Sequence, residues 1–158
     1  MSYSSAHHGF LIPYKESAMQ LNPYLLFNGD CEAACKFYEQ VLGAKIVAMM
    51  PHKGTPAAEQ VPAEWLNKIL HARLTIGDQV VMASDAPPER YSKPGGFSIN
   101  LSFSDPAEAE RVFHALAENG TEFMPLAETF WAVRFGMLED RYGIPWMVNC
   151  EKAVQKAA

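Results

Sequence analysis

Hydrophobic and polar positions along the chain follow two periods, which succeed one another in a fixed order. Residues 21–28 have the strand period, and the segment after Asp30 carries apolar residues at helical spacing up to Gly43. The strand period then returns in three segments, at about 45–50, 69–76 and 79–84. This order predicts a βαβββ unit, with Asp30 as the helix N-cap and Gly43 as the helix stop.

The same order returns from residue 97. A strand at 97–104 leads to Asp105, a predicted N-cap followed by proline at the first helical position, and Gly120 is predicted to end the helix. Strands at about 121–126, 131–138 and 145–150 complete the second unit. A shift of 75 residues places like residues in like roles: Leu26, Asp30, Ala34, Phe37, Tyr38 and Val41 fall on Leu101, Asp105, Ala109, Val112, Phe113 and Leu116. The chain is therefore predicted to contain two copies of one unit.

These two units are expected to form one domain over residues 19–151, with modules at about 19–85 and 97–151. A length of 158 residues with 49% hydrophobic content fits a single domain of this size. Residues 1–18 lack periodicity and are interpreted as a flexible N-terminal arm, and residues 152–158 as a C-terminal tail. The predicted fold class is α+β.

Net charge, apolar runs and cysteine count limit the kinds of partner and the compartment that this protein is expected to have. A net charge of -5 without a clustered basic face argues against nucleic acid. No apolar run approaches the length of a membrane span, and the first residues lack the features of a secretory signal. Three cysteines fit a reducing compartment, so a cytoplasmic protein is expected.

Two predicted strands, one in each unit, have one clean polar face. In 97–103, Ser98, Asn100 and Ser102 alternate with apolar residues, and in 70–76 so do His71, Arg73 and Thr75. One interpretation is a pair of solvated sheet faces, which antiparallel sheets often have. The other is a shared polar cleft, which the short or hydrogen-bonding side chains favour over the Lys and Glu usual on open surface.

The segments that carry this pattern resemble a known superfamily. NPYLLFNGDCEAACKFYEQVLGA, ILHARLTIGD, VMASD and ETFWAVRFGMLEDRYGIPWMVN are similar to the glyoxalase, bleomycin resistance and dioxygenase (vicinal oxygen chelate) superfamily, and within it to the PhnB-like branch. The resemblance runs from about Met19 to Glu151. It implies that the two βαβββ modules form a curled mixed sheet with the helices outside and a cleft inside.

Metal-using members of this superfamily hold a divalent ion with four side chains, usually His and Glu. The resemblance places these positions at Pro23, Ser98, Met147 and near Arg73, with His71 on the same face. Proline and methionine do not supply the donors that such an ion needs, and an arginine would repel it. We therefore expect no metal and no other cofactor.

The candidate site residues lie on the strands of both units. His71 and Arg73 lie side by side on one strand face, where a histidine can move a proton and an arginine can hold a carboxylate or phosphonate. The alternative is an exposed polar pair or a salt-bridged arginine. Trp131 and Arg134 follow a turn-rich segment and are expected to wall a pocket, although Trp131 fits a core or dimer seam equally well. Asn149 is expected to orient a ligand, or else to serve the backbone at a strand end.

Cys31 and Cys35 lie four residues apart in the first predicted helix. They are interpreted as packing residues, because no CxxC motif or second pair exists. Cys31 lies in the first helical turn, whose N-terminus favours a thiolate, so a role for this thiol is the alternative.

Two long loops, at 51–68 and 85–96, are expected to cover the cleft. Their basic side chains would give the cover a positive charge: His52, Lys53, Arg90 and Lys93.

The resulting hypothesis is a homodimer that binds a small, anionic organic molecule in a metal-free cleft. The ligand-binding residues are expected to be His71, Arg73, Ser98, Asn100, Trp131, Arg134 and Asn149, with His71 and Arg73 as the catalytic candidates. Whether the protein is an enzyme stays open. The alternatives are a metal-dependent lyase, isomerase, transferase or dioxygenase of the same superfamily, and a non-enzymatic interaction protein.

Overall fold

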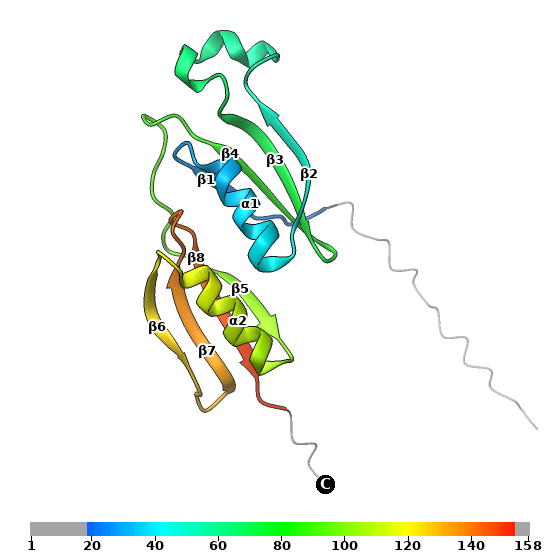
Figure 1. Cartoon of the computed structure of the whole chain (residues 1–158), viewed down its shortest axis with the longest axis vertical. Helices are drawn as coiled ribbons and strands as arrows, with labels where there is room; N and C mark the ends of the chain where they lie inside the picture. Colours follow the sequence, from blue (N-terminus) through cyan, green and yellow to red (C-terminus); the bar gives the residue numbers. More distant parts are fainter. Residues whose placement is uncertain (1–18, 154–158) are drawn as a thin grey trace, which may run out of the picture.

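The computed structural model describes residues 19–153, so the predicted arm at 1–18 and the end of the predicted tail at 154–158 lie outside the described residues. The elements follow the predicted order (Figure 1). The first unit contains β1 (Tyr24–Phe27), α1 (Cys31–Leu42), β2 (Lys45–Pro51), β3 (Ile69–Ile76) and β4 (Gln79–Asp85). The second contains β5 (Ile99–Phe103), α2 (Pro106–Ala117), β6 (Thr121–Ala127), β7 (Ala132–Glu139) and β8 (Pro145–Glu151). Two short 3-10 helices, η1 (Pro56–Gln60) and η2 (Ala63–Trp65), lie between β2 and β3.

Each unit forms its own four-stranded mixed sheet. The strand orders are β1-β4-β3-β2 and β5-β8-β7-β6, so the two sheets have the same topology. In each, the first strand pairs in parallel with the last, and the other neighbours are antiparallel. The predicted α+β class with two tandem βαβββ modules is confirmed. Within residues 19–153, no helix is long and apolar enough to cross a membrane.

Each helix buries one apolar stripe against its own sheet, and in Figure 1 both helices lie in front of their strands. The two stripes consist of Ala34, Phe37, Tyr38 and Val41 in α1 and of Ala109, Val112, Phe113 and Leu116 in α2, which the 75-residue shift pairs. Gly136 in β7 allows a close approach, because a Cβ there would lie 2.6 Å from Phe113 Cε2. No helix of residues 19–153 covers the opposite face of either sheet.

The two helix N-termini are capped differently. Asp105 accepts a hydrogen bond from the Ala107 amide at 3.0 Å, as predicted. Asp30 occupies the predicted N-cap position, but its side chain makes no capping hydrogen bond. Asp85, at the end of β4, accepts instead from the Cys31 amide at 2.9 Å, so the first helix is capped by a residue distant in sequence.

The end of α2 also differs from the prediction. The helix ends at Ala117, and Asn119, with φ of 58°, takes the left-handed conformation that glycine was expected to supply. Gly120 has another role, because a Cβ there would clash with the Glu139 carbonyl oxygen. The absence of a side chain lets the chain after α2 pass close to β7.

Asp140 joins the two modules through one buried carboxylate that is 2% exposed. Its Oδ2 accepts from the Tyr38 hydroxyl of α1 at 2.6 Å and from Trp146 Nε1 of β8 at 2.8 Å. Its Oδ1 accepts from the amides of Tyr142 at 2.9 Å and Ile144 at 3.1 Å. A single side chain thus holds the β7–β8 turn in shape and fixes the first helix to the second sheet.

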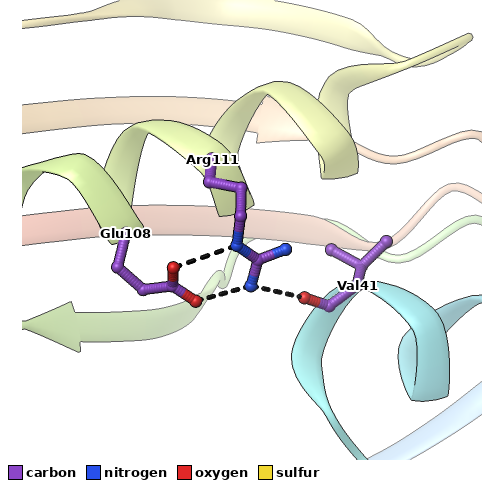
Figure 2. A network of polar contacts seen from close by, with 3 residues as sticks. All are labelled: Val41, Glu108 and Arg111. Atoms are coloured by element: carbon purple, nitrogen blue, oxygen red, sulfur yellow. Dashed lines mark hydrogen bonds and ion pairs between the residues drawn. The ribbon is translucent and has the colours of Figure 1, made fainter.

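Arg111 of α2 forms a second link between the modules (Figure 2). Its guanidinium is paired with Glu108 on its own helix and donates to the Val41 carbonyl oxygen, near the end of α1, at 3.2 Å. An arginine near a helix C-terminus satisfies a carbonyl that lacks a helical partner. The contact is half-exposed, so we expect a smaller contribution to stability than that of Asp140.

Asp140→Ala should lower the free energy of unfolding by about 3 to 5 kcal/mol, because each buried donor left without an acceptor costs about 1 to 3 kcal/mol. Asp78→Ala, in the exposed turn between β3 and β4, is the matched control and should change it by less than about 0.5 kcal/mol. Urea denaturation measures both. Equal losses for the two variants would contradict the role assigned to Asp140.

Tyr38 should make stability depend on pH in the alkaline range. Burial first, then the charge of Asp140 and its hydrogen bond, raise the pKa of Tyr38 well above its usual value of about 10. The folded protein therefore holds this proton more tightly than the unfolded chain. The stabilisation is complete below pH of about 10 and is lost as the pH rises further, by up to about 1.4 kcal/mol per pH unit. Tyr38→Phe should show a shallower alkaline loss in urea denaturation, and an unchanged slope would refute this account.

Candidate functional site

The candidate site lies on the sheet faces that no helix covers, which we call the open faces. In β3, Ala72 and Leu74 are buried toward α1, whereas His71 and Arg73 are partly exposed on the other side, as the alternation predicts. Strand register places the first open face at Tyr24, Leu26, Met50, His71, Arg73 and Met82. The second open face consists of Asn100, Ser102, Phe135, Met137, Met147 and Asn149.

His71 is held by a neighbouring strand. The Tyr24 hydroxyl of β1 lies 3.1 Å from His71 Nδ1, and the two rings are tilted with their centroids 5.8 Å apart. Arg73, two residues along β3, makes no hydrogen bond or ion pair with any of residues 19–153. The open face therefore presents a positioned histidine beside an uncompensated guanidinium.

A groove of about 620 Å³ runs between the start of β1 and the start of β5. One wall is formed by residues 21–25 and the other by residues 97–100, so Ser98 and Asn100 lie across the groove from Tyr24. Asn100 Nδ2 donates to Ser102 Oγ at 2.9 Å, which fixes the amide. The Tyr24 side chain thus connects the groove to His71 and brings polar groups of both modules near one another.

Aromatic rings cover the far part of the second open face. Trp131 is 44% exposed and packs edge to face on Phe135, with centroids 5.4 Å apart, and Phe130 also packs edge to face on Trp131. Asn149, the register partner of Phe135, has a buried Oδ1 without a hydrogen-bond donor in the described part of the chain. A buried acceptor of this kind calls for a donor from outside the chain or from a water.

Arg134 lies away from this face. It is the register partner of Cys150, on the helix-covered side, and its Nε donates to Glu110 Oε1 of α2 at 2.7 Å. An odd separation of three residues from Trp131 already implies the opposite face of a strand. The structure therefore does not bring Arg134 together with the other predicted ligand-binding residues.

The sequence of the whole domain matches one superfamily. Residues 20–148 match the sequence model of the Glyoxalase/Bleomycin resistance protein/Dioxygenase superfamily. The chain belongs to this superfamily.

Individual relatives agree with this assignment. The chain is 37% identical over 142 residues to Protein YjdN of Escherichia coli, with 85% of this chain and 97% of that protein covered. The solved structure of protein PA1353 from Pseudomonas aeruginosa is 49% identical, with a TM-score of 0.75 and coverage of 86% of this chain and 100% of that one. A PhnB protein from Bacillus cereus is 25% identical, with a TM-score of 0.72 and coverage of 84% and 99%. The predicted superfamily and the resemblance to its PhnB-like branch are confirmed.

The donor set of this superfamily member does not fit a divalent ion. Pro23 and Ser98, which stand at two of the positions implied by the resemblance, face the same groove from opposite walls. Neither proline nor the thioether of Met147 is a suitable donor. Across residues 19–153, no group of three or more His, Cys, Asp or Glu side chains could hold a metal ion.

The thiols of this superfamily member lie away from the open faces. Cys31 and Cys35 are both buried in the core, with their sulfur atoms 4.0 Å apart. The hydrogen bond with Cys35, then burial and the nearby Asp85 carboxylate, raise the pKa of Cys31. The possible activation of Cys31 at the helix N-terminus is thus opposed by its surroundings, and packing is the role that the structure supports.

The two long loops differ from the expected basic cover. Lys93 forms an ion pair with Glu139 at 2.9 Å, and His52 is buried, with only 6% of its surface exposed. Lys53 and Arg90 are exposed. No local sequence signal indicates the burial of His52 or the contact between Tyr24 and His71, because both depend on how strands and loops distant in sequence are placed.

Proposed function

We propose that this superfamily member binds a small anionic organic molecule at the open faces, through Arg73 and His71 and the groove beside them. The observation that carries the proposal is Arg73, a partly exposed arginine with no carboxylate partner among residues 19–153. Arg111, Arg134 and Arg141 differ from Arg73, because each of them forms an ion pair with a glutamate. A guanidinium offers the planar fork of donors that a carboxylate or phosphonate accepts in bidentate fashion.

The surroundings of Arg73 support a binding role. His71 is oriented by Tyr24, and the groove that Tyr24 borders has apolar walls with the polar groups of Ser98 and Asn100 at one side. Small-molecule sites typically combine mostly apolar walls with a few placed polar groups. A protein that served only as a structural partner would need no such groove, so this arrangement favours ligand binding over a purely structural role.

Trp131 and Asn149 belong to the same proposal. Trp131 presents a large, partly exposed ring, and Asn149 lies on the same open face with a buried Oδ1 that has no donor among residues 19–153. A ligand packed on the Trp131 ring would bury apolar surface, and Asn149 would contribute an acceptor once its side chain turns toward the ligand. We favour binding without turnover, because the residues at the usual metal positions supply no ligand set.

Arg73→Ala should weaken the binding of methylphosphonate or acetate by about tenfold or more, since a charge-assisted hydrogen bond contributes about 1.5 to 3 kcal/mol. Arg134→Ala is the matched control, because it removes an arginine that is ion-paired on the opposite face. Isothermal titration with methylphosphonate and with acetate measures both variants. Unchanged affinity in Arg73→Ala would show that the pocket is assigned wrongly.

The metal content of the purified protein tests the metal-dependent alternative. Elemental analysis of untagged protein should find no first-row metal in stoichiometric amount. About one equivalent per chain would instead favour a metal-using lyase, isomerase, transferase or dioxygenase with ligands other than those considered above.

The open faces are also proposed to be covered in a homodimer. They carry large apolar side chains that are 44 to 50% exposed, namely Tyr24, Leu26, Met50 and Trp131. Apolar surface of this extent is typical of an interface or a ligand groove. A second copy would enclose the groove and exclude water from Arg73.

Sedimentation equilibrium should give twice the chain mass of 17.6 kDa. Leu26→Glu, which places a carboxylate on the open face, should shift the protein toward the monomer, because a buried unpaired charge is unfavourable. Gln79→Glu adds the same charge in an exposed position and should leave the dimer intact. A monomer at all concentrations would refute the dimer.

A further inference from the structure

The groove between β1 and β5 has two unlike sides. Along both of its walls, residues with a polar group alternate with apolar ones, so the two kinds point in opposite directions. The residues with a polar group are Asn22, Tyr24, Ser98 and Asn100. Tyr24 and Asn100 belong to the open faces, whereas Leu25 and Ile99 pack with the core. The groove therefore has a polar rim at the open faces and apolar walls below it.

The apolar part of the groove continues beneath the segment that joins the modules. A smaller cavity of about 180 Å³ shares Tyr24, Leu25 and Phe97 with the groove. Its lining also includes Pro94, from the joining segment, and Ile144, from the turn before β8. The two cavities are thus neighbours, and together they form an elongated space with mostly apolar walls.

Apolar surface in this groove is left uncovered by residues 19–153. Leu21 is 97% exposed and Phe97 is 52% exposed, and both line the groove. Exposed apolar surface that lines a concavity is typical of a binding site. The groove volume of about 620 Å³ also lies in the range of about 300 to 1,000 Å³ that small-molecule sites have. A ligand with an apolar part would cover this surface.

The candidate anion-binding group lies at a distance from the groove. Strand register places Arg73 beside Met82, and Met82 beside Tyr24 at the groove rim. Neighbouring strands are about 4.8 Å apart, so the backbone of Arg73 lies about 10 Å from β1. A ligand that uses both places must therefore carry its charge at one end of an extended apolar chain.

We infer that the ligand of the open-face site is an amphiphilic anion, with a carboxylate or phosphonate at Arg73 and an apolar chain in the groove between β1 and β5. The inference rests on the proposed function, which assigns the charged end to Arg73. Its guanidinium has no carboxylate partner among residues 19–153 and fits an anionic head group. The groove gives the chain apolar surface to bury. A purely polar anion would leave the groove uncovered, and a neutral apolar molecule would leave the arginine unpaired.

The effect of chain length on affinity tests the apolar part. Isothermal titration of the full-length protein with acetate, hexanoate, octanoate and decanoate should show an increase in affinity of about fourfold for each CH₂ that enters the groove. Octanamide, which has an uncharged head, should bind at least about tenfold more weakly than octanoate. Equal affinity for acetate and decanoate, or for octanamide and octanoate, would overturn the inference.

Octylphosphonate distinguishes the two kinds of head group. Tighter binding than that of octanoate indicates an alkyl phosphonate or phosphate ester as the ligand class, and weaker binding indicates a fatty acid. Either ligand would occupy Arg73 and the groove in the same way.

Variants test the position of the chain. Phe97→Ser removes a half-exposed apolar side chain from the groove wall, so the fold should be retained while the affinity for octanoate falls about tenfold. Phe123→Ser, at an exposed phenylalanine of β6 outside the groove, is the matched control and should leave this affinity unchanged. An equal affinity of both variants for octanoate would refute the assignment of the groove.

Arg73→Ala separates failure of this inference from failure of the proposed function. The variant should bind acetate and octanoate about tenfold more weakly than the unmodified protein, because both place their head group at the same guanidinium. If both affinities fall but chain length has no effect, the anion site stands and the amphiphilic ligand is refuted. If neither affinity falls, the anion site itself is wrong, and the inference fails with it.

Discussion

The hydrogen bonds of Asp140 are the constraint on which the arrangement of the two modules depends. A duplicated βαβββ unit provides two helix-covered sheets, but nothing in the repeat itself fixes one copy against the other. Tyr38 comes from the first copy and Trp146 from the second, and both donate to one oxygen of the same buried carboxylate. A buried carboxylate is stable only when its acceptor capacity is filled, so this residue favours a single relative placement of the modules. That placement sets β1 beside β5 and so creates the groove.

The duplicated units have kept their packing and changed their polar contacts. The helix stripes of α1 and α2 correspond residue by residue, because both must fill the same space above the same sheet topology. Their N-termini do not correspond, since Asp105 caps α2 locally while Asp85 reaches Cys31 from the end of β4. Asp85 also holds the start of β3, which follows the long loop of the first module, because the Ile69 amide donates to its other carboxylate oxygen.

Much of the fold could be predicted from the sequence, because period and turn signals are local. The strand that contains His71 and Arg73 was placed correctly, and so was the face on which they lie. The errors came from contacts between distant residues: the side chain of Asp30 leaves the capping role to Asp85, and Asn119 takes the conformation assigned to glycine. Arg134 was a different error, since its three-residue offset from Trp131 already excluded a shared face. For the site, alternation could predict which side chains share a face but not that Tyr24 would orient His71.

The distribution of unpaired polar groups gives the best guide to where this protein meets other molecules. On the helix-covered sides, the buried polar groups of Asp85, Asp140 and Tyr38 all have partners. The open faces differ, because the guanidinium of Arg73 and the Oδ1 of Asn149 have no partner within the described residues. Of these two groups only the Asn149 Oδ1 is buried, and the Trp65 Nε1 in η2 is a second buried atom without a partner among residues 19–153. The case for binding at the open faces therefore depends on the partly exposed guanidinium of Arg73. The paired groups stabilise the fold, whereas the unpaired Arg73 is the basis of the binding proposed above.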